Sequence, residues 1–249
     1  MCAFERSEKG MEFNMEELEQ EINNDGEILS PGEPHSPCVL LLDTSGSMNE
    51  NQKINSLNNG INKLLEITKK DDLTSRIVDL AIIEFNNDVN VIQDFTPIMR
   101  INPVNLTANG GTAMGKALVT AIEKIREKRR EYHQIGTPCY MPWIFMITDG
   151  EPTDDIQQAI DRIRIEEHKG KDESGKIRTV AIGVPGYNEE ILKKISPRCV
   201  GVNDEGFGEI CTWIAEDLKI ISFSSVTNQV PKFEDLPENT HIIPNYWND

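Results

Sequence analysis

The stretch CVLLLDTSGS, residues 38–47, decides the fold of this chain. Its first part, CVLLLD (38–43), is a short continuous apolar run, which is typical of a β-strand buried on both faces. An acid at the end of such a strand lies at the rim of the sheet. The rest of the stretch is polar, and Gly46 lets it turn tightly. The sequence therefore predicts a buried strand that ends in an oxygen-rich loop.

Beyond this loop, apolar strands alternate with amphipathic helices. Predicted strands cover residues 38–43, 76–85, 89–95, 143–149, 177–184 and 199–202. Predicted helices follow the apolar positions within residues 54–65, 114–125, 156–163, 188–195 and 210–221. Strands that alternate with helices form a mostly parallel sheet through right-handed crossovers. The expected fold is a single α/β domain with a doubly wound, mostly parallel central sheet flanked by helices.

The N-terminal part of the chain differs in composition from this domain. Residues 1–36 hold ten acidic and two basic residues. We interpret this acidic N-terminal extension as a solvated tail. The alternative is a docking helix whose apolar positions are Phe13, Leu18 and Ile22. The domain itself is predicted to cover residues 37–222.

Residues 223–249 show no clear period and contain three prolines. They are interpreted as a C-terminal tail. The tail is expected to pack on the domain through its apolar residues, namely Ile242, Ile243, Tyr246 and Trp247.

Composition and charge restrict the classes of function. The 249 residues carry a formal net charge of −17, which repels phosphate backbones, so no nucleic-acid partner is expected. No apolar run approaches the roughly 20 residues that cross a bilayer, and the first ten residues are too polar for a signal peptide. A cytoplasmic protein without membrane contact is expected. The five cysteines are widely spaced, which indicates reduced thiols rather than a disulfide frame or a zinc site.

Polar side chains follow two of the predicted strands at the point where each strand ends. Asp43 follows VLLL, and Asp149 follows IFMIT. In a doubly wound sheet, ligands bind beyond the carboxyl ends of the strands, where the winding reverses. Ser45 and Ser47 continue the loop after Asp43, and Thr112 follows a pair of glycines at the start of a helix. These five side chains are the candidate ligands of a metal ion.

The chemistry of these donors favours a hard cation. Carboxylate and hydroxyl oxygens suit Mg²⁺, Mn²⁺ or Ca²⁺ rather than zinc. The carboxylates are too few to enclose the ion. Because Mg²⁺ commonly keeps waters or accepts a ligand from its partner, the sequence describes an incomplete shell with one position open.

Three motifs together resemble the von Willebrand factor A (vWA) and integrin-I-like family. They are DTSGS (43–47), Thr112 within GGTAMG, and Asp149 within ITDG. The resemblance covers roughly residues 37–220 and includes the order of strands and helices. It implies a metal-ion-dependent adhesion site, in which Asp43, Ser45, Ser47, Thr112 and Asp149 hold Mg²⁺ or Mn²⁺ in preference to Ca²⁺, directly or through water. It also implies a binding module rather than an enzyme, with an Asp or Glu of a protein partner filling the open position.

Within that family, the sequence segments LLLDTSGSM, LTANGGTAMGKAL and MITDGEPTDD resemble those of the bacterial cytoplasmic tellurium-resistance (TerY-like) vWA proteins. This resemblance implies a role in a stress-response or signalling system. The alternative is an adaptor that delivers clients to a hexameric AAA+ ATPase. An acidic partner group has to approach an acidic surface, so the bound cation is expected to invert the local potential.

An enzyme remains the alternative of a different class. Residues 110–116, GGTAMGK, fit the G-x-x-x-x-G-K part of a phosphate loop, and WIFMITD resembles the strand and acid that hold Mg²⁺ in nucleotide hydrolases. Against it, Ala117 stands where the metal needs a hydroxyl, and the loop follows no buried strand. Asp43 as a phosphoryl acceptor would need an acid at position 45, where a serine stands.

Three other features have structural interpretations. Asp154 and Asp155 are expected to favour the first turn of the helix that follows them. The basic run KIREKRR (124–130) is interpreted as the solvated face of its helix, with a docking surface as the alternative. The loop 133–142 is a candidate specificity loop.

Overall fold

The computed structural model describes residues 32–168, 176–203, 206–223 and 236–245. Seven strands form one sheet in the order β3-β2-β1-β4-β5-β6-β7. Their bounds are β1 Ser36–Asp43, β2 Val78–Phe85, β3 Val89–Pro97, β4 Trp143–Thr148, β5 Arg178–Gly183, β6 Arg198–Val202 and β7 Thr240–Ile243. The five inner strands run parallel, and β3 and β7 pair antiparallel at the two edges. The predicted doubly wound, mostly parallel sheet is confirmed.

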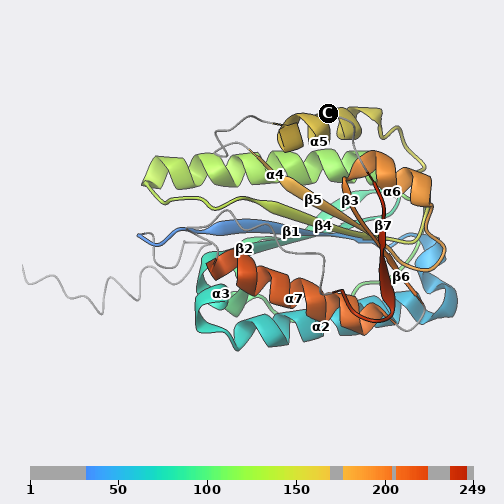
Figure 1. Ribbon diagram of the computed structural model, residues 1–249, viewed down its shortest axis with the longest axis horizontal. Helices are drawn as coiled ribbons and strands as arrows, with labels where there is room; N and C mark the ends of the chain where they lie inside the picture. Colours follow the sequence, from blue (N-terminus) through green and yellow to red (C-terminus); the bar gives the residue numbers. More distant parts are fainter. Residues whose placement is uncertain (1–31, 169–175, 204–205, 224–235, 246–249) are drawn as a thin grey trace, which may run out of the picture.

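Helices cover both faces of this sheet (Figure 1). One face carries α2 (Lys53–Lys69), α3 (Asp72–Ile77) and α7 (Phe207–Phe223), and the other carries α4 (Met114–Ile135), α5 (Gln157–His168) and α6 (Glu189–Ile195). Two short 3₁₀ helices, η1 (Gly46–Gln52) and η2 (Ile98–Arg100), complete the described elements. The result is a three-layer domain.

Alternation along β1 explains why its apolar run is continuous. Leu40 and Leu42 pack into the core beneath α2 and α7, whereas Val39 and Leu41 pack into the core beneath α4. All four side chains are fully buried. A strand with helices on both faces has no solvent-facing side, so its central positions are all apolar. Burial of each such leucine contributes about 2 kcal/mol.

The start of β2 was predicted two residues too early. Arg76 and Ile77 end helix α3 instead of opening the strand. Asp71 explains the difference, because its carboxylate accepts a hydrogen bond from the Thr74 backbone amide at 2.8 Å and caps this short helix. The predicted 143–149 strand likewise ends at Thr148, so that Asp149 already lies in the following loop.

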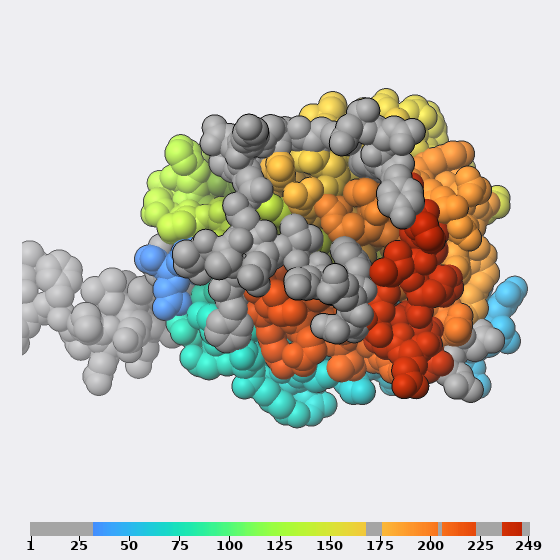
Figure 2. Space-filling model, in the orientation of Figure 1, coloured from blue at the N-terminus to red at the C-terminus, as the bar shows by residue number. Residues whose placement is uncertain are grey.

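The segment assigned to the C-terminal tail contributes a strand to the sheet. Strand β7 pairs antiparallel with β6, and Figure 2 shows residues 236–245 (red) beside the last helix and strands. Ile243 is buried in the core, whereas Ile242 is exposed. The predicted packing through Tyr246 and Trp247 lies outside the described residues. Residues 1–31 of the predicted acidic extension also lie outside them. The extension was predicted to reach residue 36, but His35 and Ser36 are already buried at the start of β1.

The two edges of the sheet are irregular or short. The pairing of β2 with β3 shifts register on either side of Ile82, and β7 has four residues.

Of the described cysteines, Cys38, Cys199 and Cys211 are buried and Cys139 is exposed, and all four are free thiols. No helix within the described ranges is long and apolar enough to cross a membrane.

The winding of the sheet reverses between β1 and β4. The chain first adds β2 and β3 on one side of β1, and then crosses over to add β4 and the later strands on the other side. In doubly wound sheets, ligands bind beyond the carboxyl ends of the strands at such a reversal. This is where the sequence places its candidate ligands.

A buried acid on α7 makes stability depend on pH. The side chain of Asp217 is almost completely buried, and its Oδ2 atom has no hydrogen-bond partner among the described residues. Burial raises its pKa from 3.8 to about 8. Below pH 4 the carboxyl group is protonated in both the folded and the unfolded chain. As the pH rises toward 8 only the unfolded chain loses the proton, so Asp217 lowers the stability progressively across this window.

We therefore expect Asp217→Asn to stabilise the protein at pH 8 by about 2 kcal/mol, with the gain vanishing near pH 4. Urea unfolding of both proteins between pH 4 and pH 8 measures this difference. Asp161→Asn, on the exposed side of α5, is the control and should change little at any pH. A pH-independent difference between Asp217→Asn and the unchanged protein would contradict a buried titrating acid.

Candidate metal centre

Three loops meet above the carboxyl ends of β1 and β4, and we call their meeting point the rim site. The loop after β1 touches the loop before α4, because the Gly46 amide donates to the Gly110 carbonyl at 2.9 Å and the Asn109 amide donates to the Thr44 carbonyl at 2.8 Å. A Cβ atom at position 46 would lie 3.3 Å from the Gly110 oxygen. Glycine at position 46 thus lets the two backbones approach closely.

Asp43 is the buried base of the rim site. Its Oδ1 atom accepts a hydrogen bond from the Ser45 amide at 2.8 Å, and its Oδ2 atom accepts one from the Thr148 hydroxyl at 2.6 Å. Burial raises the pKa of Asp43, these hydrogen bonds oppose the rise, and the charge of Asp149 adds to it. A bound cation would relieve both the burial of this charge and its repulsion by Asp149.

A chain of hydrogen bonds joins the two serines to the second aspartate. Ser45 Oγ lies 3.0 Å from Ser47 Oγ, which donates to Asp149 Oδ1 at 2.7 Å. The other oxygen, Asp149 Oδ2, accepts a hydrogen bond from the Lys53 ammonium in a buried ion pair. Lys53 also donates to the Pro185 carbonyl at 3.1 Å. An internal lysine therefore neutralises one of the two carboxylates of the rim site.

Thr112 completes the set from the third loop. A methyl group built on Gly150 would lie 3.6 Å from Thr112 Oγ1, 3.7 Å from Ser47 Oγ and 3.8 Å from Asp43 Oδ2. Oxygens from the end of β1, from the loop after it and from the loop before α4 thus surround one point beside Gly150. Two hydrogen bonds hold the backbone of Thr112 against Thr153. The Thr112 amide donates to the Thr153 hydroxyl at 3.0 Å, and the Thr153 amide donates to the Thr112 carbonyl at 2.9 Å. The structure brings all five predicted residues together.

The donor set fits a hard divalent cation. It consists of two carboxylates and three hydroxyl groups, which is oxygen chemistry suited to Mg²⁺ or Mn²⁺. Within the described part of the chain, no group of three His, Cys, Asp or Glu side chains is placed to hold a metal ion. A zinc-like site is therefore absent from those residues, and any ion at the rim site would depend on serine and threonine oxygens.

Four positioning residues were missed by the sequence reasoning. Lys53 and Thr148 contact the two aspartates directly. The other two are Asn86 and Asn87. The Asn86 carbonyl accepts from the Ala113 amide at 2.7 Å, and Asn87 Oδ1 accepts from the Gly111 amide at 2.7 Å. Both asparagines follow β2 directly, so their place at the carboxyl end of a strand was the available signal.

The phosphate-loop alternative is not supported by the start of α4. The carboxylate of Asp154 accepts hydrogen bonds from the Gly115 amide at 2.9 Å and the Lys116 amide at 2.8 Å. An acidic side chain of the protein thus occupies the place where a phosphate loop would hold its anion. Asp154 was expected to act on the following helix and instead caps α4. Asp155 accepts from the Gln157 amide at 2.8 Å, at the start of α5, as predicted.

Comparisons with known proteins identify the fold and the family. The family model of the von Willebrand factor type A domain matches residues 38–210. Because this match covers more than half of the sequence, the chain belongs to the von Willebrand factor type A domain family. A comparison with curated protein sequences gave no significant match.

Several solved structures share the fold at low sequence identity. The vWF domain of the type V pili tip protein Mfa5 from Porphyromonas gingivalis is 10% identical, with a TM-score of 0.52, over 75% of this chain and 96% of that one. The pilus adhesin SpaC from Lactobacillus rhamnosus GG is 12% identical, with a TM-score of 0.57, over 74% of this chain and 30% of that one. BatB from Bacteroides thetaiotaomicron is 18% identical, with a TM-score of 0.50, over 76% of this chain and 100% of that one. This chain spans 45% to 48% of the length of three other matched structures.

The ion pair between Lys53 and Asp149 predicts a stability effect. Lys53→Met keeps the length of the side chain but leaves the buried Asp149 carboxylate without its cation. We expect the free energy of unfolding, measured in urea without added metal, to fall by about 3 kcal/mol. Lys63→Met, at an exposed position of the same helix, is the matched control and should change it by less than about 0.5 kcal/mol. Equal effects of the two substitutions would show that the ion pair contributes little.

Proposed function

We propose that this vWA domain binds Mg²⁺ or Mn²⁺ at the rim site and uses the ion to hold an acidic side chain of a protein partner. Asp43, Ser45, Ser47, Thr112 and Asp149 are the proposed ligands, directly or through water. The observation that carries this proposal is the convergence of oxygens from the loop after β1, from Thr112 and from Asp43 around the space beside Gly150.

The charges of the rim site explain why the partner group would be a carboxylate. Asp43 and Asp149 bring two negative charges, and Lys53 compensates for one of them. A divalent cation changes the sum from one negative to one positive charge. The rim site then attracts an anionic side chain even though the whole chain carries a net charge of −17. Without the ion, the same side chain is repelled.

The structural neighbours support a binding role rather than catalysis. Two of them are a pilus tip protein and a pilus adhesin. At the start of α4, the Asp154 carboxylate occupies the backbone amides that a phosphate loop would use for its anion. The purified chain is accordingly proposed to bind without turnover. Because its motif sequences resemble those of TerY-like vWA proteins, we propose that this binding serves a cytoplasmic bacterial stress-response or signalling system.

Calorimetric titration of Mg²⁺ and Mn²⁺ into the purified chain tests the metal site. We expect one saturable site, with Asp43→Ala and Thr112→Ala each weakening the affinity at least about tenfold, because each removes an oxygen donor. Asp161→Ala and Thr120→Ala are the matched controls. Thr120 lies on α4, the helix that follows Thr112. Metal-independent heats, or equal affinities in all four variants, would remove the metal from the proposal.

Gly150→Ala tests where the ion lies. Its methyl group would enter the space between the Thr112, Ser47 and Asp43 oxygens without a close clash, since the three separations lie between 3.6 and 3.8 Å. The variant is expected to fold with unchanged thermal stability and to bind Mg²⁺ at least about tenfold more weakly, because the methyl group displaces the ion or its water. Unchanged affinity would place the ion on the opposite side of these oxygens.

The partner's contribution is tested after the metal is established. Mg²⁺-dependent capture of a partner should be lost with EDTA and with Thr112→Ala, but kept with Thr120→Ala. Substitution of single acids in that partner should then abolish capture at one position. Capture that survives EDTA would separate partner binding from the metal.

A further inference from the structure

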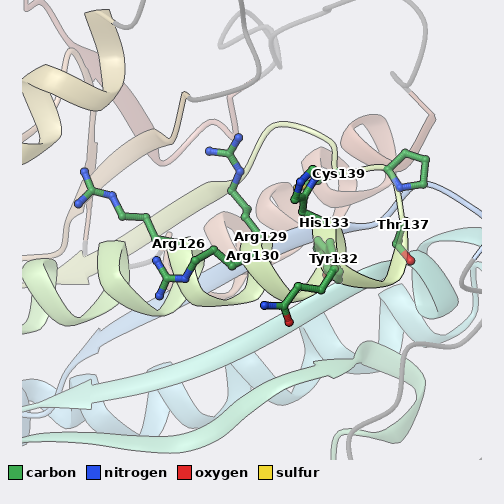
Figure 3. Close-up of a pocket in the computed structure, with 9 residues that line it drawn as sticks. Arg126, Arg129, Arg130, Tyr132, His133, Thr137 and Cys139 are labelled. Carbon is green, nitrogen blue, oxygen red and sulfur yellow. The ribbon is translucent and has the colours of Figure 1, made fainter.

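A basic pocket lies at the end of α4 that is remote from the rim site. It has a volume of about 800 Å³. Its lining includes Arg126, Arg129, Arg130, His133, Pro138 and Cys139, and no acidic residue. Figure 3 shows these side chains on the last turns of α4 and on the loop that follows. The 22 residues of α4 separate the pocket from the rim site by roughly 30 Å.

Two arginines of this pocket lack an acidic partner among the described residues, although Arg129 forms a side-chain hydrogen bond with Cys139. Arg126 pairs with Glu166, with Nε 3.0 Å from Oε1. Arg129 and Arg130 form no ion pair with any acid in the described part of the chain. Spacings of three and four residues place both arginines on the same side of α4 as Arg126 and His133. In a chain with a net charge of −17, such a patch is a specific site for an anionic group.

The N-terminal segment joins the domain at the edge of this pocket. The His35 amide donates to the Pro138 carbonyl at 2.9 Å, and the Tyr140 amide donates to the His35 carbonyl at 2.8 Å. Figure 2 shows the start of β1 (blue) beside the end of α4 (yellow-green). The backbone thus reaches the rim of the pocket at residue 35, and every residue before it is tethered there.

A buried polar cluster fixes this junction. The carboxylate of Asp79, on β2, accepts a hydrogen bond from the Tyr132 hydroxyl, and its Oδ2 atom lies 3.1 Å from His35 Nδ1. All three side chains are almost completely buried. This cluster therefore holds together the last turns of α4, the start of β2 and His35, the residue before β1. The pocket lies on the outer side of this arrangement.

The tethered segment has the charge that the pocket lacks. Residues 12–27, EFNMEELEQEINNDGE, contain seven acids and no base. Their nearest acid, Glu27, is eight residues from His35, which an extended chain spans in about 26 Å. A short tether of this kind gives an effective concentration in the millimolar range. Weak ion pairs then suffice for binding within one molecule.

We propose that the acidic segment 12–27 of this chain binds in the basic pocket at the end of α4, through ion pairs of its glutamates with Arg129 and Arg130. The segment thereby covers this arginine-lined surface. This inference is independent of the metal site, because the pocket and the rim site share no residue. It also gives the basic run 124–130 a docking role and the acidic extension a docking partner.

Cleavage of the full-length chain by a glutamate-specific protease tests this proposal. The experiment is done in EDTA at low salt, and the rate of cleavage within residues 12–27 is measured. Bound glutamates are shielded, and cleavage tracks the fraction of molecules in which the segment is released. We expect Arg129→Glu with Arg130→Glu to raise that rate about tenfold, which is the loss of two or three exposed ion pairs.

Lys63→Glu with Lys194→Glu is the matched control, since it makes the same change of charge at exposed positions of α2 and α6. It should leave the rate unchanged. Equal rates in the unchanged chain and the arginine variant would overturn the proposal. A rate in the unchanged chain that falls with rising protein concentration would overturn it in favour of a second copy as the occupant. Arginine-dependent binding of inorganic phosphate, together with equal cleavage rates, would overturn it in favour of a free anion.

Discussion

The pairing of β1 with β4 is the constraint on which the rim site depends. Its parallel register places Leu42 opposite Ile147, so the next residues, Asp43 and Thr148, emerge side by side and form a hydrogen bond of 2.6 Å. Both residues end their strands at the reversal of winding, where no helix covers them from above. The other two loops are then assembled around this pair by backbone contacts, as between Gly46 and Gly110.

Much of the fold could be predicted from the sequence because burial on two faces leaves a clear signal. A continuous apolar run means a central strand, and a 3.6-residue period means a covering helix. Strand β7 lacked such a signal, since it has four residues and only Ile243 among them is buried. Helix α3 was hidden for a similar reason. Its six residues follow the cap at Asp71 and merge with the apolar pattern of β2.

The five candidate ligands could be located because strand ends and the resemblance to a known family pointed to the same positions. Lys53 could not, because a lysine at the start of a helix normally faces solvent. Asn51 and Gln52, the last residues of η1, have left-handed φ angles of 50° and 58°. Helix α2 begins directly after this turn, and its first residue, Lys53, pairs with Asp149. Nothing in the residue pattern specifies such a turn, and only the structure shows its effect.

The distribution of charge gives the domain two unlike ends. At the carboxyl ends of the strands, acids surround a single internal lysine, and a cation would be needed to attract a further acid. At the other end of α4, three arginines line a pocket that has no acidic residue in its lining, and only Arg126 among them pairs with an acid, Glu166. The two surfaces are joined only through the rigid length of α4 and the sheet. The ligands proposed for the two surfaces would therefore not compete for the same residues.

The edges of the sheet have a consequence for how copies of the domain associate. An exposed strand edge is a template on which another chain can add a strand, and natural sheets discourage this by bulges and by very short edge strands. Here β3 departs from regular register along β2, and β7 ends after four residues. Growth of the sheet from molecule to molecule is thus discouraged at both edges. Contacts between copies of the domain at high local concentration would then favour loops and helix ends over a continuous ladder of strands.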